Sequence, residues 1–174
     1  PDQVDIHKLK HSLTEANSKV LFLTRNRLDT YISLQKALAK GEWMNIETSD
    51  LRPSLDVDAF MRWAERQTNW YEDLYDFAQT KGLPFDIVNY ESQINTSQQQ
   101  LLETCQRLLK GFGIEDQYPA DAAGHVDFTK QDKTDSPFDR IGNGAAFRDQ
   151  LLANGKLDYA MSAPLSGEVR ALSE

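Results

Sequence analysis

Arg25 and Ser33 are the two side chains whose type and spacing best suit the binding of a phosphate. Arg25 directly follows an apolar run, Lys19–Thr24, which is typical of a strand buried in a parallel sheet. Ser33 lies eight residues further on, in a segment with helical periodicity. A helix N-terminus favours an anion, and a guanidinium can hold a phosphate with two hydrogen bonds, to which a hydroxyl can add another. The alternative is a salt bridge at Arg25 and a solvated helix surface at Ser33.

Other side chains that could carry chemistry have simpler interpretations. His7 and His11 are one helical turn apart, as two metal ligands could be, but no third ligand lies nearby, so we interpret them as solvated. Cys105 falls in an apolar helical stripe, which indicates a buried packing role rather than a nucleophile. His125 lies in an irregular segment and receives no role. We interpret three acidic residues of a long predicted helix as solvated rather than as a catalytic pair: Glu72, Asp73 and Asp76.

The charge balance restricts the class of ligand. The 174 residues include 19 Lys and Arg and 27 Asp and Glu, and this net charge of −8 argues against a broad nucleic-acid-binding face. Residues 17–40 hold five basic residues and one acidic residue, a local charge of +4, which predicts a small anionic ligand or a solvated helix face. No stretch approaches the roughly 20 apolar residues of a membrane helix. The single cysteine favours a reducing compartment, and we expect a cytoplasmic location.

The hydrophobic pattern alternates between helices and strands, which predicts an α/β fold with a parallel sheet over one domain, residues 1–174. Strands are expected over 19–24, buried on both faces, and 85–90; two strands are too few for a complete sheet. Helices are expected over 8–17, 26–41, 56–81, 97 to 111 or 113, and 145–154, with glycines ending several of them. Residues 114–143 read as a long irregular connection, and the small, polar tail 160–174 is expected to be frayed.

The strand-to-helix segment Leu23–Ser33 resembles the 3′-phosphate-binding motif of sulfotransferases that use 3′-phosphoadenosine 5′-phosphosulfate (PAPS). In that family an arginine at the end of a core strand and a serine eight residues later hold the 3′-phosphate, and Arg25 and Ser33 occupy these two places. Three further segments are similar to helices of bacterial carbohydrate sulfotransferases of the nodulation-factor type: Ala37–Trp43, Trp70 with Leu74, and Leu108–Gly113.

The same resemblance assigns three more residues to the donor site. Val88–Glu91 is similar to the family's strand ending in Tyr-Glu, whose tyrosine lies near the adenine, which implies this role for Tyr90. Lys130-Gln131 and Pro137–Asn143 look like the late nucleotide-side loop and the helix start after it, which implies that Lys130 and Arg140 bind the nucleotide.

The resemblance implies a P-loop-like, three-layer sulfotransferase fold. The implied reaction moves a sulfuryl group from PAPS to a hydroxyl or amine of a small-molecule or glycan acceptor, with a carbohydrate expected, and needs no metal. The family's 5′-phosphosulfate loop contains glycine near the N-terminus, whereas the first glycine here is Gly41. We therefore expect the C-terminal part of a sulfotransferase domain, without its N-terminal strand, that loop or the general base, so no catalytic residue is assigned.

Such a segment is expected to lack sulfuryl-transfer activity by itself and to self-associate through an exposed sheet edge. The alternative is a non-catalytic nucleotide-binding or protein-interaction module with a degenerate site at Arg25.

Overall fold

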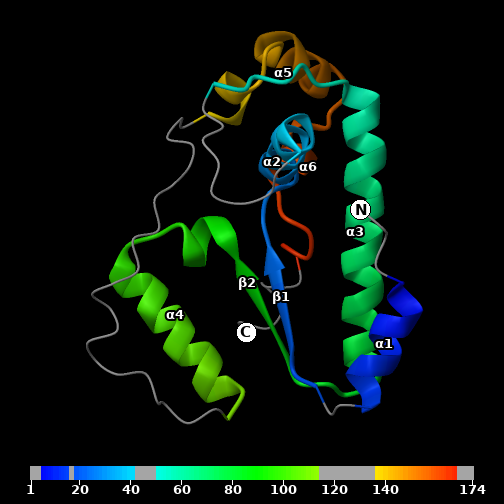
Figure 1. Ribbon diagram of the computed structural model, residues 1–174, viewed down its shortest axis with the longest axis vertical. Coiled ribbons are helices and arrows are strands. Elements are labelled where there is room, and N and C mark those ends of the chain that lie inside the picture. Colours follow the sequence, from blue (N-terminus) through cyan, green and yellow to red (C-terminus); the bar gives the residue numbers. More distant parts are fainter. Residues whose placement is uncertain (1–4, 16–17, 42–49, 114–135, 168–174) are drawn as a thin grey trace.

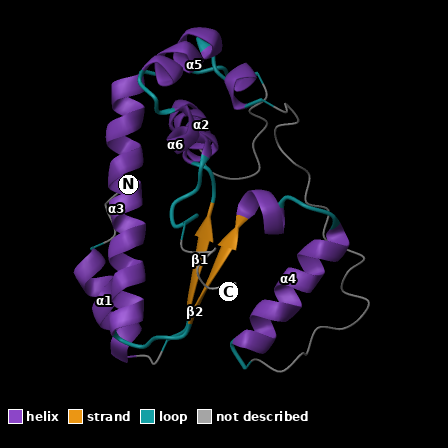
Figure 2. Cartoon of the chain, turned by 180° about the vertical axis from the view of Figure 1, so that it is seen from behind, coloured by secondary structure: helices purple, strands orange, loops and turns teal. Residues whose placement is uncertain are grey.

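Two short parallel strands form the sheet of the computed structural model, which describes residues 5–15, 18–41, 50–113 and 136–167. β1 (Val20–Thr24) and β2 (Phe85–Asn89) pair in register, from Val20 with Phe85 to Thr24 with Asn89. The carboxyl ends of both strands therefore lie at the same edge of the sheet (Figure 2). The described part of the chain is mixed α/β and mostly helical, as the sequence predicted at this coarse level.

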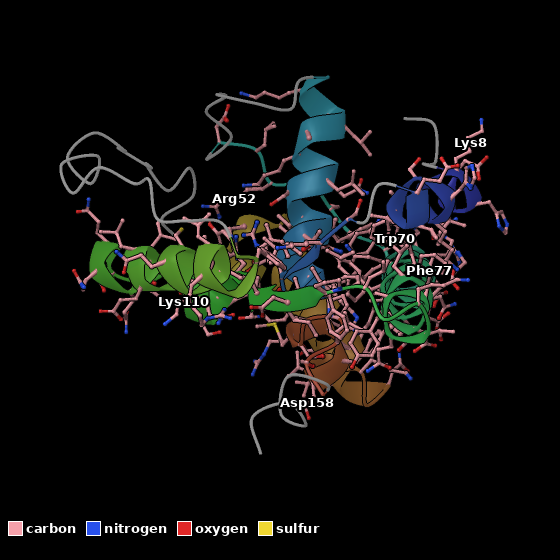
Figure 3. All side chains as sticks on the ribbon, turned by 90° about the horizontal axis from the view of Figure 1, so that it is seen from below. Lys8, Arg52, Trp70, Phe77, Lys110 and Asp158 are labelled. Atoms are coloured by element: carbon pink, nitrogen blue, oxygen red, sulfur yellow. The ribbon has the colours of Figure 1, made fainter. Side chains whose placement is uncertain are left out.

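Helices lie around the two strands, and the predicted ones begin and end within two residues of the expected bounds. α3 runs along one side of the strands and α4 lies to the other side, so that Phe77 and Lys110 are on opposite sides of the sheet (Figures 1 and 3). The helices are α1 (Ile6–Glu15), α2 (Arg27–Lys40), α3 (Val57–Thr80), α4 (Gln98–Gly111), α5 (Gly144–Ala153) and α6 (Leu157–Met161). Two short turns are of other helix types: the π-helical η1 (Tyr90–Ile94) and the 3₁₀ turn η3 (Pro137–Arg140).

Polar side chains fix the first turn of the main helices. The Asn26 side chain accepts a hydrogen bond from the Asp29 N–H at the start of α2, as its sequence position predicted. Ser97 and Gln100 form a reciprocal capping box at the start of α4. Gly41 follows α2 with a φ of 72°, a left-handed conformation that glycine adopts without a steric penalty.

The described core consists of two apolar clusters. The first joins α2, α3, α5 and α6, and its fully buried members include Leu28, Phe60, Phe147 and Leu151. The second lies between the sheet and the C-terminal half of α3, and it consists of Phe22, Leu74, Tyr75, Ala78, Ile87 and Leu165. α3 takes part in both clusters, because its apolar stripe continues over its whole length.

The expectation that β1 is buried on both faces is wrong. Phe22 and Thr24 are buried, whereas Leu21 and Leu23 are 47% and 51% exposed. Successive side chains of a strand point to opposite faces, and α3 packs against the face that carries Phe22. Periodicity could not reveal this difference, since all the residues of the run are compatible with burial.

The polar tail is ordered by packing as far as Leu165, which corrects the expectation of fraying from residue 160. Ala160, Ala163 and Leu165 are buried, and α6 contacts α2. Leu165 belongs to the core cluster beside the sheet. The small side chains of this segment suggested a frayed tail in the sequence. In the structure they allow the segment to approach α2 closely. Residues 168–174 lie outside the described ranges.

The remaining side chains singled out in the sequence have the following environments. Cys105 is half-buried in α4 rather than fully buried. His7 and His11 are exposed, and Nε2 of His11 lies 3.4 Å from Oε1 of Glu15. The three acidic residues of α3 are also exposed, as predicted. Among the described residues no helix is long and apolar enough to cross a bilayer.

Candidate functional site

Arg25 and Tyr90 lie beside each other at the carboxyl edge of the sheet. Each residue directly follows one of the two strands, and the pairing of Thr24 with Asn89 brings these strand ends together. Cζ of Arg25 lies 4.7 Å from the centre of the Tyr90 ring, a distance at which a guanidinium is attracted to an aromatic face. The second strand ends one residue earlier than predicted, so Tyr90 begins η1. Tyr90 therefore lies in this turn, with its ring next to the guanidinium of Arg25.

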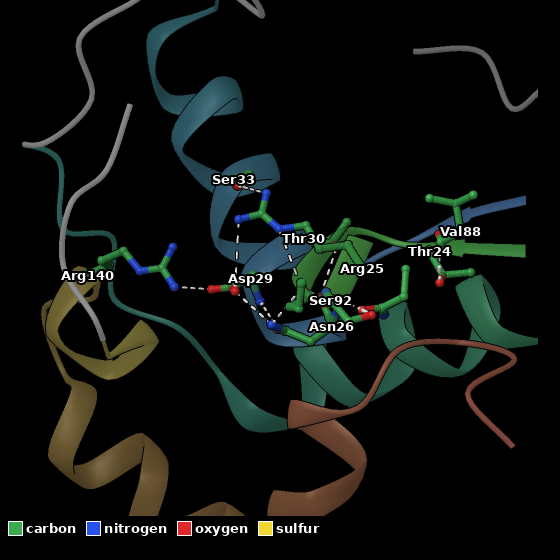
Figure 4. A network of polar contacts seen from close by, with 11 residues as sticks. Thr24, Arg25, Asn26, Asp29, Thr30, Ser33, Val88, Ser92 and Arg140 are labelled. Carbon is green, nitrogen blue, oxygen red and sulfur yellow. Dashed lines mark hydrogen bonds and ion pairs between the residues drawn. The ribbon is translucent and has the colours of Figure 1, made fainter. Parts of the chain in front are cut away.

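Ser33 contacts Arg25 across the first two turns of α2. Nη1 of Arg25 donates a weak hydrogen bond to Oγ of Ser33, with 3.4 Å between the two atoms (Figure 4). Ser33 is exposed, and the Arg25 side chain is 31% exposed. The two residues that the sequence paired are therefore neighbours on the accessible side of α2.

Two carboxylates flank the Arg25 guanidinium without pairing closely with it. Nη2 of Arg25 lies 3.9 Å from Oδ2 of Asp29, and Nε lies 4.0 Å from Oε1 of Glu91. Nε is buried and has no hydrogen-bond partner among the described atoms. Stacking on Tyr90 and the two carboxylates thus hold the guanidinium in place, and its one hydrogen bond among the described residues is the weak one to Ser33.

Asn26 donates hydrogen bonds to the carboxylate oxygens that could otherwise accept them from Arg25. Its backbone N–H and its Nδ2 both donate to Oε1 of Glu91, each at 3.0 Å. Nδ2 also donates to Oδ2 of Asp29 at 2.7 Å. The side-chain amide of Asn26 therefore contacts both acidic side chains, and its contact with Asp29 is drawn in Figure 4.

The start of α2 already holds an anion, which changes the role expected for its N–H groups. We predicted free N–H groups that could bind a phosphate. Instead the Asn26 N–H donates to Glu91, the Arg27 N–H to the Ser162 carbonyl, and the Asp29 N–H to Asn26 Oδ1. The Glu91 carboxylate occupies the position at which the helix dipole stabilises negative charge. A ligand at this edge would therefore be held by side chains rather than by these N–H groups.

Arg140 lies on the other side of Asp29 from Arg25 (Figure 4). Its Nη2 pairs with Oδ1 of Asp29, and its side chain is only 9% exposed. Its Nε is buried and has no hydrogen-bond partner among the described atoms. Arg140 thus fixes Asp29 and joins η3 to α2. Two arginines and the carboxylates of Asp29 and Glu91 make the described part of the site neutral in formal charge.

Arg27 is a buried cation that sequence reasoning did not identify. It is 5% exposed, its Nε donates to Thr68 Oγ1 at 2.9 Å, and its Nη1 donates to the Ser162 carbonyl at 2.9 Å. Its Cζ lies 4.1 Å from the centre of the Tyr159 ring. Burial lowers the pKa of this guanidinium below its ordinary value, and the nearby Tyr159 opposes that shift. A basic residue in the first turn of a helix opposes the helix dipole, and this was the available signal that it serves a tertiary contact.

The five predicted donor-site residues therefore differ in their placement. Arg25, Ser33 and Tyr90 form one contact group, and Arg140 reaches that group through Asp29. Lys130 lies outside the described residues. Sequence reasoning did not assign Asn26 and Glu91 to the site, although each is the second residue after a strand and could have been found from that position.

The fold and the site together define a mixed α/β protein with a stacked arginine at the carboxyl edge of a parallel strand pair. Comparison with protein-family models, with curated proteins and with solved structures found no match to this chain. Among the described residues, no group of three His, Cys, Asp or Glu side chains is suited to hold a metal ion.

Proposed function

We propose that this chain binds PAPS and 3′,5′-ADP through Arg25, Ser33 and Tyr90 and forms the 3′-phosphate and adenine side of a sulfotransferase donor site. When bound, PAPS would supply the sulfuryl group for transfer to an acceptor hydroxyl or amine, with a carbohydrate as the expected acceptor. The part of the enzyme proposed here acts by binding and orientation, which are major contributions to such a transfer. The proposed fold is the P-loop-like one of that enzyme class.

The observation that carries the proposal is that, among the described residues, Arg25 makes one weak hydrogen bond and no close ion pair. Its guanidinium is held over Tyr90 with its nearest carboxylate oxygens 3.9 and 4.0 Å away. A phosphate could accept hydrogen bonds from this group without first breaking a close ion pair.

Ser33 and Tyr90 have complementary roles in the proposal. The Ser33 hydroxyl, 3.4 Å from Arg25 Nη1, can donate to the same phosphate because a hydroxyl has both a donor and acceptors. The Tyr90 ring orients the guanidinium and offers an aromatic surface to the adenine. Arg140 acts at a distance from the phosphate, since its described partner is Asp29.

The test is calorimetric titration of the 174-residue chain with 3′,5′-ADP and with 5′-AMP. The chain should bind 3′,5′-ADP more tightly, and Arg25→Ala should remove about 1.5–3 kcal/mol of that binding free energy, the range for hydrogen bonds to charged groups. Binding of 5′-AMP should change much less. Arg25→Lys should restore only part of the loss, because a point charge does not reproduce the planar fork. Equal losses for both nucleotides would contradict the assignment.

A second function, a non-catalytic interaction module, is favoured by the neutral charge of the site. Asp29 and Glu91 compensate Arg25 and Arg140, and such a network can serve to join α2 to η1 and η3 without a ligand. Absence of any nucleotide binding by the folded chain, in calorimetry at millimolar nucleotide, would favour this function over the first.

A further inference from the structure

We propose that Asn26 is a positioning residue that keeps the Glu91 and Asp29 carboxylates from pairing with Arg25, and thereby keeps Arg25 available to an anionic ligand. This inference rests on the proposed function for its ligand, but its structural part can be tested without any nucleotide.

The contacts of Glu91 show how this would work. Oε1 of Glu91 accepts two hydrogen bonds of 3.0 Å from Asn26, whereas the same oxygen lies 4.0 Å from Arg25 Nε. An unshielded carboxylate and guanidinium at this distance would ordinarily close to a charge-assisted hydrogen bond of about 2.8 Å. The side-chain amide of Asn26 supplies one of the two competing donors, and the backbone N–H supplies the other.

Asp29 is restrained in the same way. Its Oδ2 accepts a 2.7 Å hydrogen bond from Asn26 Nδ2 and lies 3.9 Å from Arg25 Nη2, and its Oδ1 pairs with Arg140. Asn26 Nδ2 therefore contacts both acidic side chains that flank Arg25. This double contact is specific to an amide, because the other good N-cap residues lack two donor hydrogens at that position.

Asn26→Ser separates the positioning role from the capping role. Serine is also a good N-cap, so it can still accept a hydrogen bond from the Asp29 N–H, but it removes the amide that donates to both carboxylates. We expect Arg25 to pair with Glu91 in this variant. Binding of 3′,5′-ADP should then weaken about tenfold, the effect of losing roughly one charge-assisted hydrogen bond.

Glu91→Gln in the same chain is the rescue variant. Glutamine keeps the shape of the side chain and an acceptor for the Asn26 N–H, but it carries no charge that could capture Arg25. The double variant Asn26→Ser/Glu91→Gln should therefore recover most of the affinity for 3′,5′-ADP. A double variant that binds as weakly as Asn26→Ser would overturn the inference, as would an Asn26→Ser variant that binds like the wild type.

Arginine side-chain NMR gives a readout that needs no nucleotide. The Nε–H resonance of Arg25, assigned by its loss in Arg25→Lys, should move downfield in Asn26→Ser as it begins to donate to Glu91, and should return in the double variant. Asn89→Ser is the matched control, because Asn89 caps η1 at the end of β2 but its described side-chain contact is with Ser92. An Arg25 resonance that stays unchanged in Asn26→Ser would overturn the inference.

These two readouts distinguish the inference from the proposed function. If the wild type does not prefer 3′,5′-ADP to 5′-AMP while the Arg25 resonance responds as described, the proposed function fails and the role of Asn26 stands. If nucleotide binding requires Arg25 but the Arg25 resonance and the affinity are both unchanged in Asn26→Ser, the role of Asn26 is contradicted and the proposed function stands.

Discussion

The guanidinium of Arg25 lies over the ring of Tyr90, 4.7 Å from Cζ to the ring centre, although the two residues are far apart in the sequence. The parallel pairing of β1 and β2 creates this contact, because their last residues, Thr24 and Asn89, are paired directly. Arg25 is thereby fixed at the carboxyl edge of the sheet, where ligands of parallel sheets commonly bind.

Two substitutions of Tyr90 distinguish the contribution of its ring to nucleotide binding from that of its hydroxyl. Tyr90→Ala should weaken 3′,5′-ADP binding, because it removes both the surface under Arg25 and the surface offered to adenine, and a cation–π contact alone contributes about 0.5–2 kcal/mol. Tyr90→Phe should largely preserve binding, since the ring remains. Calorimetry of both variants, with circular dichroism to verify folding, checks this prediction. Unchanged affinity in a folded Tyr90→Ala variant would leave the ring with a packing role only.

Loss of the buried Arg27 should destabilise the junction of α2, α3 and α6. Arg27→Ala removes the guanidinium that donates to Thr68 Oγ1 and to the Tyr159 and Ser162 carbonyls, and a hydrogen bond to a charged group contributes about 1.5–3 kcal/mol. Urea unfolding should therefore show a loss of at least about 2 kcal/mol of unfolding free energy.

Arg62→Ala is the matched control for Arg27, because Arg62 is an exposed arginine of α3. It should change the unfolding free energy by less than about 0.5 kcal/mol, as is usual for surface substitutions. Equal effects of the two substitutions would show that the Arg27 contacts do not contribute to stability.

The stability of the chain should fall at alkaline pH through Tyr71. The Tyr71 hydroxyl donates to the Leu23 carbonyl at 2.7 Å, and burial raises the pKa of Tyr71 above its ordinary value. The folded state therefore retains a proton that the unfolded state releases above about pH 10, so the contribution of Tyr71 is full below that pH. It is lost as the pH rises from there through the raised pKa of the folded state.

Urea unfolding at pH 8 and at pH 10.5 measures this effect. Tyr71→Phe should be less stable than the wild type at pH 8, since it lacks the hydrogen bond to Leu23, but it should lose less stability between the two pH values. Tyr31, whose pKa burial also raises, remains in both proteins and contributes equally to each. A wild type and variant with the same pH dependence would contradict the prediction.

Gly144 should tolerate no side chain. A Cβ atom added there would overlap the Phe138 carbonyl oxygen, in the turn that precedes α5. Gly144→Ala must displace η3, which carries Arg140, and should destabilise the chain by at least about 1–3 kcal/mol, the usual cost of overpacking. Differential scanning calorimetry should show a lower Tm.

Gly111→Ala provides the control for Gly144, since a Cβ there would meet nothing within 4 Å and the residue ends α4. This variant should unfold at the wild-type temperature or slightly above it, because alanine favours a helix by about 1 kcal/mol over glycine. Equal effects of the two substitutions would indicate that η3 accommodates the extra atom.

Local sequence signals determined where the two strands and the five predicted helices lie, whereas α6 was not predicted. The cap Asn26, the acceptor Asp56 and the left-handed Gly41 act within one helical turn, and so the bounds of α2 and α3 were predicted to within two residues. The contact of Arg25 with Ser33 was also predictable, because eight residues along a strand-to-helix segment fix its geometry. Whether that contact serves a nucleotide stays a prediction.

Only the tertiary structure decided which residues of these elements are buried and which ion pairs compensate their charges. The exposure of Leu21 and Leu23, the burial of Arg27, and the pairing of Asp29 with Arg140 depend on elements far away in the chain. An apolar run or an arginine has the same local propensity whether a neighbour covers it or not, because burial and ion pairing are determined by the packing of distant segments. The sequence therefore identified Arg25 as a candidate anion ligand, whereas only the tertiary structure placed Glu91 beside Arg25 and paired Arg140 with Asp29.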